Sequence, residues 1–117
     1  MKNILIKGNN VRIADFGESK VIKINSGSLT GIKGSETHLP PELLFLDEFS
    51  KVKASCSHDI WSLGILAYQI FSDGNHPFKK PSSTELDWKN DVKLGKYIID
   101  SFISQDSPIY QIIKGII

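Results

Sequence analysis

Two oxygen-bearing side chains near the N-terminus stand where folding could bring them together. Short apolar, β-branched runs at 3–6 and 11–14 flank a Lys-Gly-Asn-Asn turn, a pattern that predicts an antiparallel hairpin. Asn3 would begin the first strand and Asp15 would follow the second, so strand pairing places the two residues near each other. The two side chains supply a carboxylate and an amide oxygen, and each residue taken alone is commonplace at a turn or a strand start.

Four longer stretches occur in a fixed order along the chain. They are Lys2 to Ile6, Ile13 to Gly17, Gly34 to Glu42, and Asp59 to Gly64 followed by His76 to Phe78. Together they resemble four landmarks in the C-terminal lobe of a protein kinase: the end of the catalytic loop, the D-F-G motif, the segment that ends in A-P-E, and the D-x-W-S-L-G helix. Because a lone Asp-Phe-Gly is weak evidence, the order of all four carries the resemblance, which covers residues 3 to about 78.

The resemblance implies transfer of the γ-phosphoryl group of ATP to serine or threonine of a protein, with ATP and Mg²⁺ as cofactors. In the family's register, Asp15 would hold the magnesium that bridges the β- and γ-phosphates, and Asn3 would hold the second magnesium. Phe16 would pack beside the site and set the direction of Asp15, and Gly17 would permit the turn. The expected cofactor-binding set is therefore Asn3, Asp15, Phe16 and Gly17.

The groups that complete such a site are expected upstream of Met1. In the signature H-R-D-x-x-x-x-N the catalytic Asp precedes the Asn that Asn3 matches, and the Gly-rich loop, the strand Lys and its helix Glu have no match in the 117 residues. We therefore expect residues 1–117 to be a partial kinase domain, truncated at both ends and without a catalytic residue of its own. Such a chain alone is expected to be inactive.

Residues 18–33 match the activation loop and are predicted to form a mobile connection. Its hydroxyl residues best placed for phosphorylation are Ser26, Ser28 and Thr30. The Arg that often binds such a phosphate would lie before Met1, so a plain solvated loop is the favoured interpretation. The substrate-facing part that follows holds Ser35, Thr37, His38 and Glu42. Gly34-Ser35 resembles the serine/threonine branch, while His38 replaces a Tyr and is expected to pack rather than to act as an acid or base.

Glu42 and Asp59 match carboxylates whose partners in the family lie outside these 117 residues. We expect both to be buried without a partner, at a cost of roughly 3–5 kcal/mol each, which predicts a weakly stable chain. The apolar residues of the helix after Asp59 are expected to form the core: Trp61, Leu63, Ile65, Leu66, Tyr68, Ile70 and Phe71.

The pattern predicts a mainly α fold with one small β-hairpin. Pro41 suits the start of a short helix to Leu46, and residues 47–55 are expected to be a polar connection. Ser57 is a candidate N-cap for a helix that ends near Phe71, with apolar residues on every face and therefore surrounded by other elements. Two further helices are expected at 86–99 and 110–117.

The composition of the chain limits the kinds of partner and compartment that we expect. A net charge of +1 gives no field that would attract nucleic acid, and Arg12 is the only arginine. Cys56 stands alone, which excludes an intrachain disulfide and suggests a buried thiol in a reducing compartment. No apolar stretch is long enough to span a membrane, and a cytoplasmic location is the default expectation.

A rival interpretation is a non-catalytic kinase remnant. Such a chain would bind a protein partner through the face that the absent lobe leaves exposed, instead of a protein substrate. A narrower similarity concerns the loop from Ser72 to Phe78, which resembles the corresponding loop of kinases of the endoplasmic-reticulum stress sensor type over those residues only.

Overall fold

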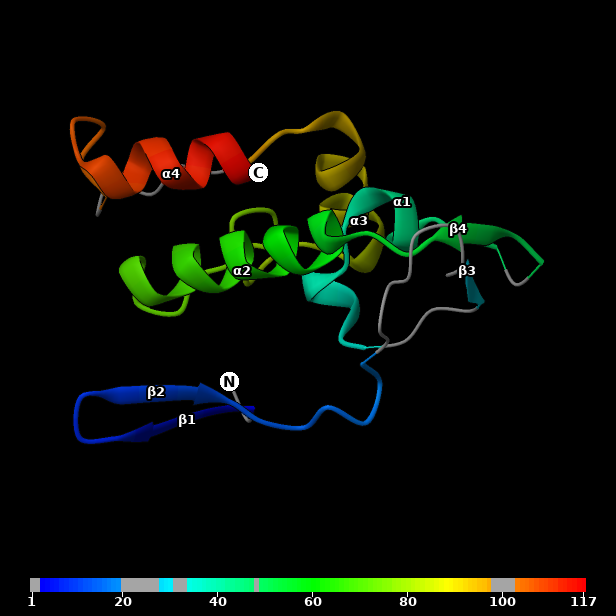
Figure 1. The fold of residues 1–117 in the computed structure, drawn as a ribbon. Helices are drawn as coiled ribbons and strands as arrows, with labels where there is room; N and C mark the ends of the chain where they lie inside the picture. The colour runs from blue at the N-terminus through cyan, green and yellow to red at the C-terminus, as the bar shows by residue number, and fades with distance from the viewer. Residues whose placement is uncertain (1–2, 20–27, 31–33, 48, 98–102) are drawn as a thin grey trace.

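Helices predominate in the computed structural model, which describes residues 3–19, 28–30, 34–47, 49–97 and 103–117 (Figure 1). The strands are β1 (Ile4–Lys7), β2 (Asn10–Ile13), β3 (Ser28–Thr30) and β4 (Lys51–Lys53). The helices are the 3-10 helix η1 (Glu36–His38) and the α-helices α1 (Pro41–Leu44), α2 (Cys56–Phe71), α3 (Glu85–Leu94) and α4 (Pro108–Ile116). The predicted fold class, mainly α with a small hairpin, is confirmed.

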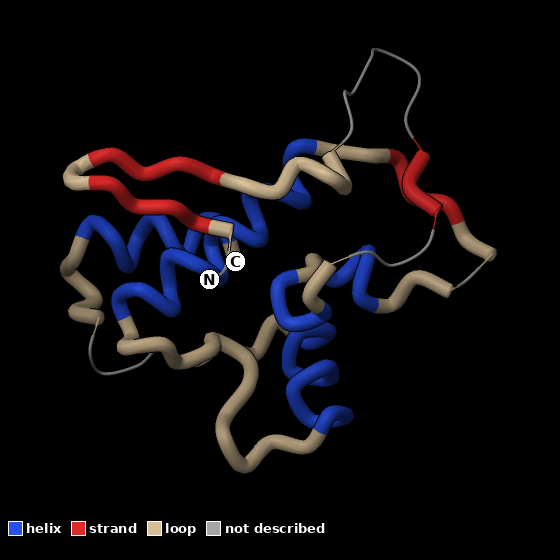
Figure 2. The backbone as a smooth tube through the Cα atoms, turned by 90° about the horizontal axis from the view of Figure 1, so that it is seen from below, coloured by secondary structure: helices blue, strands red, loops and turns tan. Residues whose placement is uncertain are grey.

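β1 and β2 form the predicted antiparallel hairpin. Gly8 in its turn has φ 58°, a left-handed value that glycine adopts at little cost. The register pairs Ile4 with Ile13 and Ile6 with Val11, so the apolar pairs share one face, because alternate residues of a strand point to opposite faces. Figure 1 shows the hairpin below α2, and the view from below in Figure 2 shows it in front of the helices.

Local capping residues set the ends of the helices. Ser55, not the predicted Ser57, is the N-cap of α2, and its hydroxyl accepts from the Ser57 N–H at 3.2 Å. Thr84 and Asp87 form a capping box that begins α3. Gly95 is left-handed at φ 63° and ends α3 earlier than predicted, because that backbone conformation stops an α-helix. Positions 98 and 99 of the predicted helix lie outside the described residues.

Two clusters of buried side chains form the core. The first joins α1, α2 and α3 and contains Leu39, Leu44, Ile65, Phe78, Trp88 and Val92. The second joins α2 to the C-terminal segment and contains Tyr68, Ile103 and Ile113. Between the clusters, α4 packs directly on the backbone of α2: a Cβ built on Gly64 would lie 2.5 Å from Cγ2 of Ile116.

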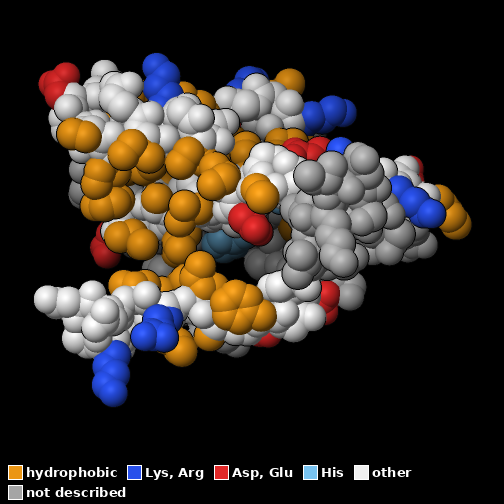
Figure 3. Space-filling model, in the orientation of Figure 1, with side chains coloured by type: hydrophobic (Ala, Val, Ile, Leu, Met, Phe, Trp, Pro, Cys, Tyr) orange, Lys and Arg blue, Asp and Glu red, His pale blue; other side chains and the backbone are white. Residues whose placement is uncertain are grey.

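The expectation that α2 is surrounded on every face is wrong. Ile60, Leu63, Ile70 and Phe71 are between 46% and 56% exposed, and Leu66 is half-buried. Figure 3 shows hydrophobic side chains gathered on the surface where α2 lies and on the hairpin below it. The thiol of Cys56, the first residue of α2, is exposed and not buried as expected.

The sequence pattern missed the pairing of β3 with β4. Ser28 is the register partner of Lys53, and Thr30 is the register partner of Lys51. Two segments that were expected to be loops, 18–33 and 47–55, are therefore joined by a short antiparallel ladder. Of the three candidate phosphorylation sites, Ser28 and Thr30 lie on β3, whereas Ser26 lies outside the described residues.

Candidate functional site

The hairpin brings Asn3 and Asp15 to the same end of one element. The Ala14 N–H donates to the Asn3 carbonyl at 2.9 Å, which extends the β1–β2 ladder by one pair beyond Ile4 and Ile13. Asp15 is the next residue, and both Asn3 and Asp15 are exposed. The predicted proximity of these two residues therefore follows from the observed register.

Asp15 has an unusual backbone. Its φ is 64°, in the left-handed region that Asp and Asn enter more readily than other residues with a side chain. Its Oδ1 lies 3.4 Å from the Gly17 N–H, which donates to it. The turn was expected to need Gly17, but the positive φ falls on Asp15 itself. Phe16 is 66% exposed, so the packing expected for this ring is not present among the described residues.

Asn3 and Asp15 offer oxygen ligands to a metal ion. Amide and carboxylate oxygens suit Mg²⁺, which usually keeps several waters and takes only one or two protein carboxylates together with substrate phosphates. Within the described ranges, no group of three or more His, Cys, Asp and Glu side chains is placed to bind a metal without such help. The donor atoms of this pair are therefore of the kind that Mg²⁺ accepts.

The segment Ser35–His38 is held by a chain of side-chain hydrogen bonds. The hydroxyls of Ser35 and Thr37 are 3.0 Å apart, Thr37 Oγ1 is 3.0 Å from His38 Nδ1, and His38 Nε2 is 3.0 Å from Gln69 Oε1. Because an amide oxygen only accepts, His38 carries its hydrogen on Nε2 and accepts from Thr37 at Nδ1. Thr37 can then accept from Ser35. This network supports the expectation that His38 packs, since both ring nitrogens are engaged.

A second histidine joins the same segment to the loop after α2. His76 Nε2 lies 2.7 Å from the Thr37 carbonyl, and His76 Nδ1 accepts from the N–H groups of Phe78 at 3.2 Å and Lys79 at 3.1 Å. Burial lowers the pKa of His76 below its ordinary value, with the nearby His38 and Lys79 adding to the effect and the Thr37 carbonyl opposing it. The sequence pattern places His76 only in a loop motif and gives no sign of this contact.

A hydrogen bond and an ion pair hold η1 against α2 and α3. The Ser62 hydroxyl lies 2.9 Å from the His38 carbonyl and can donate to it. Lys89 on α3 forms ion pairs with Glu36 at 3.1 Å and with Glu85 at 2.9 Å, and hydrogen bonds to Glu85 and Glu36 raise the pKa of Lys89. The helices α2 and α3 and the loop after α2 thus hold the segment Ser35–His38 in position.

The expectation of two orphaned, buried carboxylates is wrong. Glu42 is exposed, and its Oε1 lies 3.4 Å from Nε2 of His58, a partner within this chain. Asp59 is exposed in the first turn of α2, where a negative charge is favourable at the positive end of the helix dipole. Neither residue therefore imposes the large desolvation cost that was expected.

Trp61 packs against the first buried cluster. Its ring stacks on Phe78 with ring centroids 5.8 Å apart and an interplanar angle of 11°. Trp88 on α3 is buried nearby, with the amine groups of Lys79 and Lys89 at 5.6 Å and 5.7 Å from its ring centroid. Within the described residues neither indole N–H has a hydrogen-bond partner.

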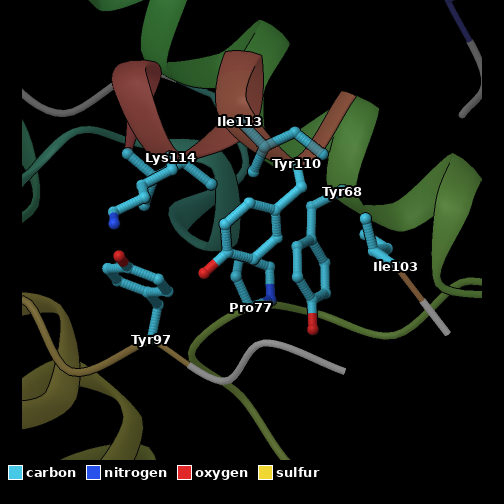
Figure 4. Close-up of a pocket in the computed structure, with 8 residues that line it drawn as sticks. Tyr68, Pro77, Tyr97, Ile103, Tyr110, Ile113 and Lys114 are labelled. Carbon is cyan, nitrogen blue, oxygen red and sulfur yellow. The ribbon is translucent and has the colours of Figure 1, made fainter. Parts of the chain in front are cut away.

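An apolar pocket lies away from these groups, between α2, α4 and the segment after α3. Figure 4 shows Tyr68, Tyr110 and Pro77 close together, with Tyr97 and Lys114 on another side. Its lining residues include no Asp, Glu or His. The pocket therefore lacks the carboxylate that the end of the hairpin offers.

Comparison with known proteins supports the resemblance to protein kinases. A family model described as "Protein kinase domain" matches residues 1–115, so the chain belongs to the protein kinase family. In the part of the chain that the structure describes, no helix is long and apolar enough to cross a membrane.

Individual kinases are also similar to this chain. It is 33% identical over 107 residues to an Aurora kinase of Yarrowia lipolytica, covering 91% of this chain and 26% of the relative. It is 29% identical over 87 residues to the receptor-like tyrosine-protein kinase kin-15 of Caenorhabditis elegans, covering 74% and 18%. It is 31% identical over 91 residues to the serine/threonine-protein kinase zyg-8 of the same organism, covering 78% and 11%. The chain thus spans between 11% and 26% of the length of these relatives.

Proposed function

We propose that this chain forms the metal-binding and substrate-facing half of a serine/threonine protein kinase active site. The observation that carries the proposal is the 2.9 Å hydrogen bond from the Ala14 N–H to the Asn3 carbonyl, which brings Asn3 beside the residue before Asp15. Membership of the protein kinase family supports the use of ATP and magnesium.

In this proposal Asp15 and Asn3 hold Mg²⁺ through a carboxylate and an amide oxygen. When bound, the metal neutralises charge on the transferring phosphoryl group. The left-handed backbone of Asp15 turns the chain sharply after β2 and leaves its carboxylate exposed at the hairpin end. Phe16 and Gly17 follow at this turn and complete the proposed nucleotide-side segment.

The choice of serine or threonine as acceptor rests on the Gly34-Ser35 pair. Among the similar kinases, zyg-8 is named a serine/threonine kinase and kin-15 a tyrosine kinase, so the names alone do not decide. In the structure the Ser35 hydroxyl is exposed and hydrogen-bonded to Thr37, at the start of the segment that we propose faces the protein substrate.

We infer that residues 1–117 make up only part of the active site. They contain no His-Arg-Asp triplet and no Gly-rich phosphate loop. General-base catalysis contributes about 10²–10⁴-fold to such reactions, so we expect the 117 residues alone to show no transfer from radiolabelled ATP above a heat-treated control.

The metal site is tested by NMR with Mn²⁺ and ATP, because Mn²⁺ replaces Mg²⁺ and broadens the resonances of nearby nuclei. We expect broadening of the Asn3 side-chain amide and of the backbone amides from Asp15 to Gly17. Asp15→Asn should weaken Mn²⁺ binding by about tenfold or more. Asp73→Asn is the matched control, since Asp73 is exposed like Asp15 and its φ of 54° is also left-handed. Equal effects of the two substitutions, or none, would contradict the proposed ligands.

A second candidate function is docking of a protein partner on the exposed apolar surface. It is favoured by the exposed residues of α2 and by the hairpin face, where Ile6 is 72% and Val11 64% exposed. Sedimentation equilibrium tests whether this surface associates. Self-association that Leu63→Gln abolishes, but Leu86→Gln on α3 does not, supports a docking face. A monomer at every concentration tested argues against it.

A further inference from the structure

The ring of His76 makes three hydrogen bonds that together require one protonation state. The Thr37 carbonyl can only accept, so Nε2 of His76 must carry a hydrogen. The backbone N–H groups of Phe78 and Lys79 can only donate, so Nδ1 must carry none. The neutral tautomer with hydrogen on Nε2 satisfies all three partners, and no other state does.

The surroundings of His76 disfavour a positive charge on its ring. The ring is half-buried, lies edge-on to Trp88 with centroids 6.2 Å apart, and is 6.4 Å from the ring of His38. Besides burial, the charged groups that lower its pKa are His38 on η1 and Lys79 on its own loop. That loop also carries Asp73 and Lys80, η1 carries Glu36, and α3 carries Glu85, Asp87, Lys89, Asp91 and Lys93. Glu36 and Glu85 are engaged by Lys89, so they do not offer His76 a free counter-charge.

We propose that His76 is a positioning residue that, while it is neutral, ties the N–H groups of Phe78 and Lys79 to the segment Ser35–His38 through its ring. Protonation releases those two N–H groups, while the bond to the Thr37 carbonyl in the segment remains. Protonation would place a hydrogen on Nδ1 facing the N–H groups of Phe78 and Lys79, so two acceptances would be lost at once. That the segment faces a protein substrate rests on the proposed function, but the hydrogen-bonding device does not.

The direction of the pH dependence follows from the lowered pKa. Between the native pKa of His76 and its ordinary value of 6.5, the unfolded chain binds more protons at this residue than the native chain does. Stability from His76 is therefore fully present above pH 6.5 and is lost progressively as the pH falls through the native pKa. The N–H groups of Phe78 and Lys79 should accordingly be held by the ring at neutral pH and released in acid.

The experiment is an NMR titration of the ¹⁵N-labelled chain without nucleotide or metal, so it can fail or succeed independently of the kinase proposal. At pH 7.5 we expect His76 to show the Nε2–H tautomer, and on acidification the amides of Phe78 and Lys79 should shift together with the His76 ring. A native pKa above 6.5, or an Nδ1–H tautomer, would overturn the proposal.

Variants separate His76 from the other histidines. His76→Gln keeps one acceptor and one donor but cannot titrate, so the amides of Phe78 and Lys79 should lose the acid-induced shift. His58→Gln is the matched control, because His58 is also half-buried but pairs with Glu42, and it should retain the shift. A shift that persists in His76→Gln would assign the titration to His38 and overturn the proposal. If His76→Gln does not fold, the titration of the unmodified chain decides.

Discussion

Replacing Gly64 by alanine tests how closely α4 lies on α2. An added Cβ would lie 2.5 Å from Cγ2 of Ile116 and 3.2 Å from both Cβ of Ile116 and Cγ1 of Ile117. Isoleucine is β-branched and has one strongly preferred χ1 rotamer in a helix, so Ile116 cannot simply rotate away. The helix α4 would have to shift, and with it the side chains that line the second cluster.

Two opposing effects set the magnitude. Alanine is better than glycine in a helix interior by about 1 kcal/mol, whereas an extra methyl group in a packed interface costs about 1–3 kcal/mol. We expect Gly64→Ala to lower the free energy of unfolding by about 1 kcal/mol, measured by urea denaturation followed by circular dichroism. Gly115→Ala on α4 is the matched control, because nothing lies within 4 Å of a Cβ built there. That control should raise the free energy of unfolding by up to about 1 kcal/mol.

The test depends on whether Gly64→Ala lowers the free energy of unfolding while Gly115→Ala raises it. If both substitutions stabilised the chain equally, α4 could not be packed on Gly64 and the second cluster would be assembled differently. Adding Ile116→Ala to Gly64→Ala removes the atom that would clash, so the loss caused by the first substitution should shrink. An undiminished loss in the double variant would show that the strain lies elsewhere in α2.

Three further predictions concern the buried core, the ion pair between α1 and α2, and the capping box of α3. Ile65→Ala should cost about 2–5 kcal/mol in a urea melt, because Ile65 is 1% exposed, whereas Asp15→Asn should change stability little; the reverse order would mean that core and site are misassigned. Glu42→Gln should cost less than about 1 kcal/mol in a urea melt, because the carboxylate that pairs with His58 is 47% exposed; a larger loss would mean that Glu42 has a stronger partner. Thr84→Ala should cost about 1 kcal/mol through loss of the capping box, seen as reduced helicity and a lower urea midpoint; an unchanged midpoint would contradict the cap.

The sequence predicted what depends on local periodicity and turn chemistry. The Lys-Gly-Asn-Asn turn fixed the register of β1 and β2, and that register accounts for the proximity of Asn3 and Asp15. The apolar run that became α2 was also located correctly, with an error of two residues at its N-cap. These features are set by neighbours in the chain, so a single sequence contains the information for them.

The sequence could not predict what depends on distant packing. The apolar pattern of α2 does not say which faces are covered, and Leu63 is 52% exposed although it was expected in the core. The pair between Glu42 and His58 needs α1 to lie beside α2, and the three bonds of His76 need η1 to meet the loop after α2.

The hairpin that holds Asn3 and Asp15 contributes no residue to either buried cluster in the part of the chain that the structure describes. Two-stranded hairpins without further support are marginal in water, and regions with little buried apolar surface open with free energies far below that of global unfolding. The amides of β1 and β2 should therefore exchange with deuterium much faster than those in the middle of α2. A cation that binds Asn3 and Asp15 must also close the hairpin, so its apparent affinity is reduced by the fraction of molecules in which the hairpin is open. Any surface that covers Ile6 and Val11 would then tighten metal binding without touching either ligand.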